Sequence, residues 1–188
     1  MGFWNTGNAQ KDPKRNFRFK IQFEGLTDDT TSIVWYAKKV GKPNFSVTES
    51  KHSFLNHTFY WPGRVEWQAI TMTLVDPISP NAVNRINEMI ENAGYKIPGG
   101  VDGSFETMSK QKAAGANGTG TVVIMQIDSN DVVLEKWTLH APWIKSVKYG
   151  DLDYENDELT EIELEIRYDW AKCDTTGAAG SKKFETTT

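Results

Sequence analysis

The chain has 188 residues, of which 38% are hydrophobic, 12% aromatic and 24% charged, and its formal net charge is -4. An acidic balance argues against a nucleic-acid-binding protein that depends on a basic surface. The single cysteine, Cys173, cannot form an internal disulfide, and no apolar run approaches the roughly 18 residues that span a membrane. These properties are typical of a globular domain with one hydrophobic core.

The N-terminal part of the chain predicts a flexible arm followed by two strands. Residues 1–15 are polar and have no periodicity, so we expect an arm in which Phe3 and Trp4 are free to dock on a neighbour. Residues 16–24 alternate apolar and polar side chains, which is typical of a half-buried antiparallel strand. Residues 32–40 predict a second strand.

The segment 51–76 predicts a long β-hairpin. Its Pro-Gly pair lies between two runs rich in strand-forming residues, so we expect the turn at residues 61–64. Arms of about ten residues are long for strands, and unpaired strand edges invite pairing with another chain. We therefore expect the hairpin to contact another chain. The residues expected in these contacts are Phe54, Asn56, Trp61, Pro62, Gly63 and Arg64, together with Phe3 and Trp4.

One helix is expected at residues 79–93. Ser79 suits the N-cap, Pro80 suits the first helical position, and apolar residues recur at steps of three and four. Gly94 is well placed to end this helix. Residues 97–120 are rich in Gly, Ser and Ala and predict a long loop without a phosphate-binding glycine pattern.

The C-terminal part predicts further antiparallel strands. They are expected at residues 121–127, 132–140, 143–149 and 160–170. In the last of these strands, Glu161, Glu163 and Glu165 alternate with apolar residues and share one polar face. Residues 171–188 predict a disordered polar tail. The domain proper therefore covers residues 16–170, and its pattern indicates a mainly β barrel or sandwich with one flanking α-helix.

Patterns that suggest chemistry have simpler interpretations. The acidic segment 151–158 could bind calcium, but it lacks the glycine and the spacing of an EF-hand loop, so a solvated turn is favoured. The glutamates of the final strand could act as a glycosidase pair, but residues at alternate strand positions simply line one wet face, so a polar strand face is strongly favoured. The three histidines have no metal spacing and no nucleophile motif is present. We expect no enzyme activity, no metal and no cofactor.

The order of these features resembles the tail tube proteins of contractile-tailed phages, over residues 16 to 170. The resemblance rests on Arg15-Asn16-Phe17 at the first strand, on Phe54, Gly63 and Trp67 of the hairpin, on the strand and single helix that follow, on Leu152-Asp153-Tyr154 with Asp157-Glu158, and on Tyr168-Asp169-Trp170. It implies an antiparallel β-barrel or sandwich with a flanking helix, a fold shared with secretion-tube subunits.

The resemblance also implies a structural role. Members of that family form hexameric rings whose inner strands join into one barrel, and the rings stack into a tube inside a contractile sheath above a baseplate. The resemblance therefore implies that the hairpin and the N-terminal arm contact a neighbouring subunit or the adjacent ring. It also implies that the face with Glu161, Glu163 and Glu165 lines the lumen or faces solvent. It implies a virion tail protein assembled in the host cytoplasm, without membrane insertion, through which double-stranded DNA passes unbound. A tube-initiating or tube-terminating ring and a secretion-system tube subunit remain open. From a different class, so does a monomeric β-barrel that binds a ligand or carbohydrate through its aromatic side chains.

Overall fold

The computed structural model describes residues 13–24, 37–78, 81–96, 107–115, 118–155 and 157–175. These residues form ten strands and two helices. In chain order they are β1 (Phe19–Glu24), β2 (Ala37–Val40), β3 (Phe45–Phe54), β4 (His57–Trp67), β5 (Ile70–Val75), α1 (Ala82–Asn92), α2 (Lys110–Ala113), β6 (Thr121–Ile127), β7 (Val133–His140), β8 (Trp143–Tyr149), β9 (Glu161–Arg167) and β10 (Trp170–Thr175).

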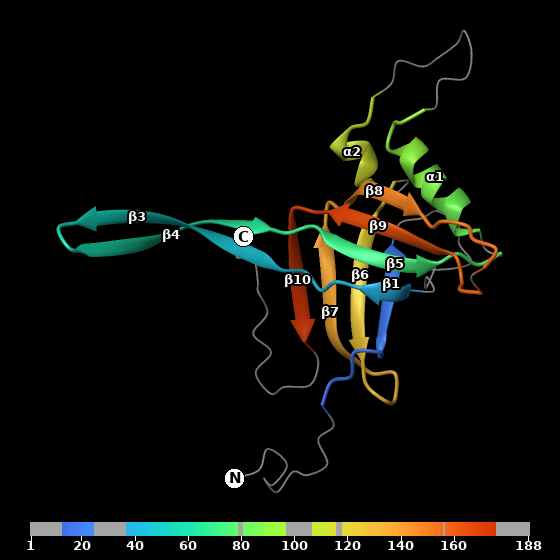
Figure 1. Ribbon diagram of the computed structural model, residues 1–188, viewed down its shortest axis with the longest axis horizontal. Helices are drawn as coiled ribbons and strands as arrows, with labels where there is room; N and C mark the ends of the chain where they lie inside the picture. The colour runs from blue at the N-terminus through green and yellow to red at the C-terminus, as the bar shows by residue number, and fades with distance from the viewer. Residues whose placement is uncertain are drawn as a thin grey trace, which may run out of the picture.

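Eight of the strands form two antiparallel sheets, and the other two form a separate hairpin. Sheet A has the strand order β1-β6-β7-β10 and sheet B the order β2-β5-β9-β8. The strands of sheet A run across those of sheet B, and the β3–β4 hairpin extends far from both (Figure 1). The protein is therefore mainly β, as the sequence predicts, and carries a long two-stranded projection.

The core lies between the two sheets and is built by alternation along the strands. In β9, Ile162, Leu164 and Ile166 are buried, and the intervening glutamates point away from the core. Leu164 lies opposite Met72 of β5, which is also fully buried. Because the side-chain period of a strand is two, this register places Ile70, Met72 and Leu74 of β5 in the core with the three apolar residues of β9.

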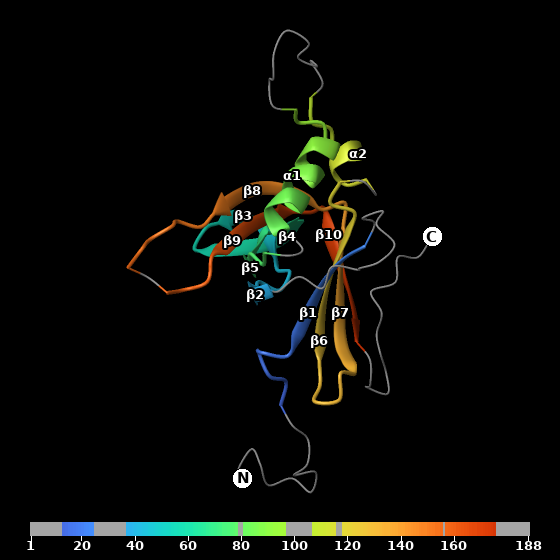
Figure 2. The same cartoon turned by 90° about the vertical axis from the view of Figure 1, so that its right-hand side faces the viewer.

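Helix α1 covers one side of this core. Its buried side chains include Ile86 and Met89, which lie one turn apart on the helix face that meets the core. The amide oxygen of Asn87 accepts a hydrogen bond from the Tyr149 hydroxyl of β8 at 3.0 Å. Figure 2 shows α1 and α2 together at the end of the molecule beside β8. Neither described helix has the length and apolar character needed to cross a membrane.

Most strand predictions are confirmed. Strands β6, β7 and β8 match the predicted segments to within one residue. Strand β1 begins later than predicted, because Phe17 lies before it and is 74% exposed. The predicted strand 160–170 divides in two: β9 ends at Arg167, and Trp170 begins β10 in the other sheet.

One boundary of the predicted helix differs from the sequence-based expectation, and the other is confirmed. The N-cap of α1 is Asn81, whose side chain accepts a hydrogen bond from the Asn84 N–H at 3.0 Å; Ser79 and Pro80 lie outside the described residues. Gly94 follows the helix with a φ of +106°, which only glycine adopts without strain, so its predicted role is confirmed.

The predicted loop and tail both contain regular structure. Within 97–120, helix α2 forms behind an N-cap serine, whose hydroxyl accepts a hydrogen bond from the N–H of Lys112. The polar tail does not begin at residue 171, because residues up to Thr175 belong to β10 and pair with β7. The arm up to residue 12 and the tail from residue 176 lie outside the described residues.

Candidate assembly surfaces

The turn of the long hairpin lies at its tip, at Leu55 and Asn56. Phe54 of β3 is paired with His57 of β4, which leaves two residues in the loop. Leu55 has a φ of +52°, the left-handed conformation that two-residue hairpin turns require. The expectation of a turn at residues 61–64 is therefore wrong.

Gly63 and Arg64 instead form a β-bulge in the middle of β4, opposite Thr48 of β3, and Pro62 beside them pairs with Glu49. The pairing register shifts between Val47 and Glu49 of β3, so that β4 contributes one residue more than its partner. A Cβ on residue 63 would lie 2.9 Å from the carbonyl oxygen of Thr48, which only glycine avoids. Pro and Gly are both common at bulges, since Pro cannot donate a hydrogen bond to the ladder and Gly tolerates the close approach of another backbone. In this chain the Pro-Gly pair therefore marks a bulge and not a turn.

The base of the hairpin is anchored to the body by aromatic packing. The ring of Trp67 lies 6.0 Å from that of the buried Tyr168 and 5.1 Å from that of Phe45, measured between ring centroids. Tilted aromatic pairs at such distances are favourable. This contact sets the direction in which the hairpin leaves the body.

The outer half of the hairpin presents aromatic side chains to solvent. Trp61 lies against Phe59 and His52 on one face of the ribbon, at ring-centroid distances of 6.2 and 6.4 Å. Phe54 is 63% exposed and Leu55 is 87% exposed. A group of exposed apolar side chains on a projection is typical of an interaction surface.

The residues that the sequence assigned to contacts are therefore spread along the hairpin. All six hairpin positions are exposed. Phe54 and Asn56 lie at the tip, whereas the segment from Trp61 to Arg64 lies in the middle of β4. Leu55 was missed, although its position between Phe54 and Asn56 could have indicated a two-residue turn. Phe3 and Trp4 lie outside the described residues.

The outer edges of the two sheets differ. In sheet A, β1 and β10 are six residues long and pair with their neighbours without a register shift. In sheet B, β2 has only four residues, and both β2 and β8 contain a shift. Short strands and bulges protect edges from pairing with other chains. Only sheet A therefore offers two regular edges among the described residues.

The three glutamates of β9 point out of the core, but they do not form an isolated acidic face. Glu163 pairs with Lys148 at 3.0 Å, Glu165 pairs with Lys145 at 2.7 Å, and Glu161 pairs with Lys38. These lysines come from the neighbouring strand β8 and from β2 at the edge of sheet B. The hydrogen bond from Lys145 holds the pKa of Glu165 below its ordinary value.

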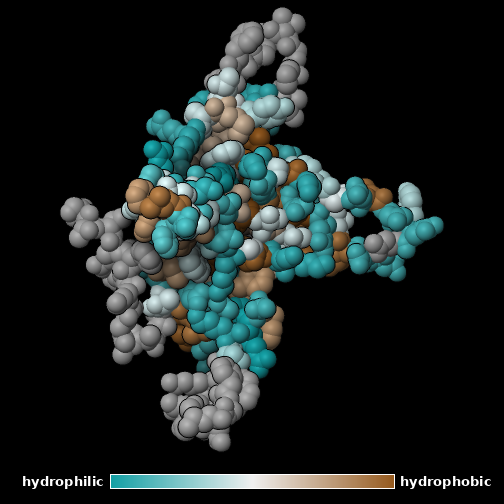
Figure 3. Space-filling model, turned by 60° about the vertical axis from the view of Figure 1, so that its left-hand side comes forward, coloured by the Kyte–Doolittle hydropathy of each residue, from teal (hydrophilic) through white to brown (hydrophobic). Residues whose placement is uncertain are grey.

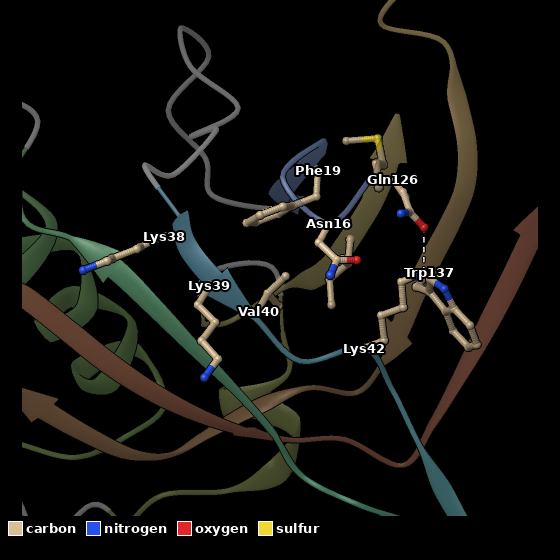
Figure 4. A pocket seen from close by; sticks show the side chains of 10 residues that line it. Asn16, Phe19, Lys38, Lys39, Val40, Lys42, Gln126 and Trp137 are labelled. Atoms are coloured by element: carbon tan, nitrogen blue, oxygen red, sulfur yellow. Dashed lines mark hydrogen bonds between the residues drawn. The ribbon is translucent and has the colours of Figure 1, made fainter. Parts of the chain in front are cut away.

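A cavity of about 410 Å³ lies between β2 and the inner face of sheet A (Figure 4). There Lys42 donates hydrogen bonds to Gln126 at 2.6 Å and to Glu135 at 2.7 Å. Burial alone would raise the pKa of Glu135, but hydrogen bonds from Lys14, Lys42 and Trp137 outweigh it and lower the pKa to about 2. The Glu135 carboxylate of β7 is therefore ionised at neutral pH and cannot donate a proton there. Its ion pairs connect β7 to Lys14, which precedes β1, and to Lys42, which follows β2.

The connection between β8 and β9 is acidic and extends from the body. Its apolar side chains Leu152, Tyr154 and Leu159 are exposed. The Asp153 carboxylate accepts a hydrogen bond from the Glu155 N–H at 3.0 Å, a local turn contact. Among the residues that the structure describes, no three His, Cys, Asp or Glu side chains are grouped in a way that could hold a metal ion.

Comparison with known proteins gives a fold match without a sequence match. No protein-family model matches the chain, and no curated protein matches it. Among solved structures, a chain in the tube-terminating cap of the anti-feeding prophage is 16% identical, with a TM-score of 0.61, and the match covers 94% of this chain and 100% of that one.

Two further structures lie at the same level of similarity. A chain in the baseplate of the anti-feeding prophage is 15% identical, with a TM-score of 0.61 and coverage of 87% of this chain and 96% of that one. A chain in the extended sheath–tube complex of the extracellular contractile injection system PVC is 13% identical, with a TM-score of 0.60 and coverage of 90% and 96%. The resemblance that the sequence indicated is therefore confirmed at the level of the fold.

Proposed function

We propose that this protein is a tube subunit of a contractile tail or injection machine, and that it assembles into rings through the edges of sheet A. The observation that carries the proposal is the pair of regular six-residue edges on β1 and β10. The fold likeness to chains of contractile injection systems supports the same role.

The directions of the strands favour a closed ring. Every pairing in sheet A is antiparallel, and the sheet has four strands, so β1 and β10 run in opposite directions. When identical copies stand side by side around an axis, β10 of one copy therefore meets β1 of the next as an antiparallel neighbour. Pairing of this kind removes every open edge of sheet A, which is the usual way in which β proteins avoid aggregation.

The hairpin and the N-terminal arm then serve to join one ring to the next. The hairpin extends well beyond the two sheets and carries exposed aromatic residues at its tip (Figure 1). We assign to this contact Phe54, Leu55, Asn56 and the segment 61–64 of the hairpin. Phe3 and Trp4 of the arm are proposed to take part.

The role of the subunit is structural. Six copies per ring form a conduit through which double-stranded DNA passes in a virion tail. Its partners in that setting are the sheath and the baseplate, and it carries out no chemistry. Sheet A, through which the ring closes, mixes acidic and basic groups, as the pairs of Lys20 with Asp131 and of Lys172 with Asp174 illustrate. A wall of this kind has little net attraction for phosphates, so cargo slides without binding.

A terminating ring is the second candidate. The likeness to a chain of a tube-terminating cap covers all of that chain and 94% of this one, which supports a role at the end of a tube as well as in its body. The two roles differ in how assembly proceeds, since a body subunit adds rings without limit and a terminating ring stops after one.

Sedimentation velocity over a concentration series, followed by negative-stain electron microscopy of each fraction, tests the proposal. A tube subunit gives stacked rings with a central hole, and a terminating ring gives single rings. A uniform monomer at every concentration contradicts ring formation and favours the ligand-binding barrel instead.

A further inference from the structure

Two projections of the molecule carry opposite charges. Residues 50–61, the outer half of the hairpin, include Lys51, His52 and His57 and contain no Asp or Glu. Residues 150–160, the β8–β9 connection, include five carboxylates and contain no Lys, Arg or His. We call these segments the hairpin tip and the acidic loop.

Both segments also expose apolar side chains. On the hairpin tip Leu55 is 87% exposed, and Phe54 and Trp61 are more than half exposed. On the acidic loop Leu152 is 88% exposed, and Tyr154 is fully exposed. Each projection therefore combines apolar contact area with charge of one sign, which is the composition of a specific interface.

Three of the five carboxylates of the acidic loop are not part of an ion pair among the described residues. Asp151, Asp153 and Glu155 form no ion pair with any described residue, in contrast to the glutamates of β9 nearby. Lys51 of the hairpin tip likewise has no ion pair within the described part of the chain. These charges are available to another molecule without breaking contacts within the subunit.

The two projections lie at opposite ends of the molecule. In Figure 1 the hairpin reaches to the left, while the connection between β8 and β9 lies at the far right. Figure 3 shows two separate projections, of which the one on the right is mostly hydrophilic with isolated apolar residues. One subunit therefore cannot bring its own hairpin tip to its own acidic loop.

We propose that the hairpin tip of one copy docks on the acidic loop of a second copy. This inference rests on the proposed function, because it names the surface that receives the hairpin. A contact between two different patches is head-to-tail, so each copy offers one free patch of each kind, and the contact repeats from copy to copy. Opposite charges on the two patches orient the copies, and the apolar side chains supply the buried area.

A hollow beside the acidic loop fits this role. A cavity of about 530 Å³ lies between the loop and the edge strand β2. It is lined by Ala37, Lys38, Val75, Asp157, Glu158, Leu159 and Glu161. Val75 and Leu159 give it an apolar side, against which an aromatic ring of the hairpin tip can pack, and Asp157 adds a carboxylate at its rim.

Charge reversal in two separate variants tests the pairing. The hairpin variant is Lys51→Glu with His57→Glu, and the loop variant is Asp151→Lys with Glu155→Lys. Asp153 is left unchanged because its carboxylate caps the local turn. The control, Glu88→Lys with Glu91→Lys, makes the same change in charge as the loop variant on the exposed side of α1.

Each reversed variant alone places like charges at the contact, so we expect the concentration for half-assembly to rise about tenfold or more. A 1:1 mixture of the two variants restores opposite charges at every contact and should assemble at the wild-type concentration. The control should assemble like the wild type. Circular dichroism of each variant verifies that the fold is intact.

The outcomes separate this inference from the proposed function. If the wild type does not assemble, the tube proposal itself fails. If the wild type assembles and both reversed variants assemble equally well, the tube proposal stands and the pairing is wrong. The pairing is also wrong if each variant fails and the mixture fails as well, because the two reversed charges then do not meet.

Discussion

The hydroxyl of Thr48 binds both backbone polar groups of Arg64 across the hairpin. It accepts a hydrogen bond from the Arg64 N–H at 2.8 Å and donates one to the Arg64 carbonyl at 3.3 Å. This side chain therefore satisfies the backbone groups that the bulge removes from the regular ladder. The bulge is therefore stabilised by a specific side chain. It determines on which face of the hairpin Phe59 and Trp61 lie.

Replacing Gly63 by alanine should loosen the hairpin without unfolding the body. The new Cβ would lie 2.9 Å from the Thr48 carbonyl oxygen, so the bulge must shift. We expect faster hydrogen exchange in residues 45–67, equivalent to about 1–3 kcal/mol of local strain, and an unchanged melting temperature. Gly41→Ala is the control, because its Cβ would meet no atom closer than 3.6 Å. Equal exchange in both variants would contradict the assignment of the bulge.

Leu55 should destabilise the turn of the hairpin and at the same time stabilise the contact between copies. Its φ of +52° costs a β-carbon-bearing residue roughly 1 kcal/mol, and asparagine tolerates that conformation better. Leu55→Asn should therefore slow hydrogen exchange at the tip and at the same time weaken assembly. Leu55→Ala keeps the strain and also loses the apolar contact. Wild-type assembly by both variants would show that the tip makes no contact.

The Glu135 carboxylate should make the protein sensitive to acid. Hydrogen bonds to Lys14 and Lys42 lower its pKa to about 2 in the folded state, below the ordinary value of 4.5. Because the folded pKa is depressed, the stabilisation is complete above about pH 4.5 and is lost as the pH falls toward 2.

Glu135→Gln should therefore lower the free energy of unfolding by on the order of 2 kcal/mol at pH 7, since both lysines are half-exposed and partly screened. Urea denaturation at pH 7 and pH 3 measures the difference, which should shrink at the lower pH. A difference that is the same at both values would mean that the carboxylate contributes through shape and not through charge.

Strand β9 should tolerate changes on one face only. Leu164 is 1% exposed in the centre of the core, so Leu164→Ala should cost about 2–5 kcal/mol of unfolding free energy. Its neighbour Glu163 makes a surface pair with Lys148, so Glu163→Ala should cost less than about 1 kcal/mol. Tryptophan fluorescence during urea denaturation measures both. Similar costs for the two variants would contradict the two-faced assignment of the strand.

The sequence predicts those elements whose own pattern decides their structure. Strand β9 is an example, since its alternation alone identifies Leu164 as buried and Glu163 as exposed. Strand β10 was missed because its sequence, WAKCDT, has no alternation; it becomes a strand by pairing with β7, a partner distant in the sequence.

The turn of the hairpin could not be located from local residue preferences. Pro62 and Gly63 are strong turn formers, but Pro62 pairs within the hairpin ladder and Gly63 lies in the bulge opposite Thr48, so the turn is at Leu55 and Asn56. The ion pairs on the β9 face could not be predicted from local sequence either. Lys148 and its neighbours lie on other strands, so the pairing with Glu163 appears only when the sheet order is known.

Hydrogen–deuterium exchange of the assembled protein, compared with the dissociated subunit, tests the central claim that rings close through sheet A. Both edge strands, residues 19–24 and 170–175, should gain strong protection on assembly, because their outward N–H groups become paired with a neighbouring subunit. The edge strand β8 of sheet B, residues 143–149, should change little. Protection confined to sheet B, with no change in residues 19–24 and 170–175, would contradict the account.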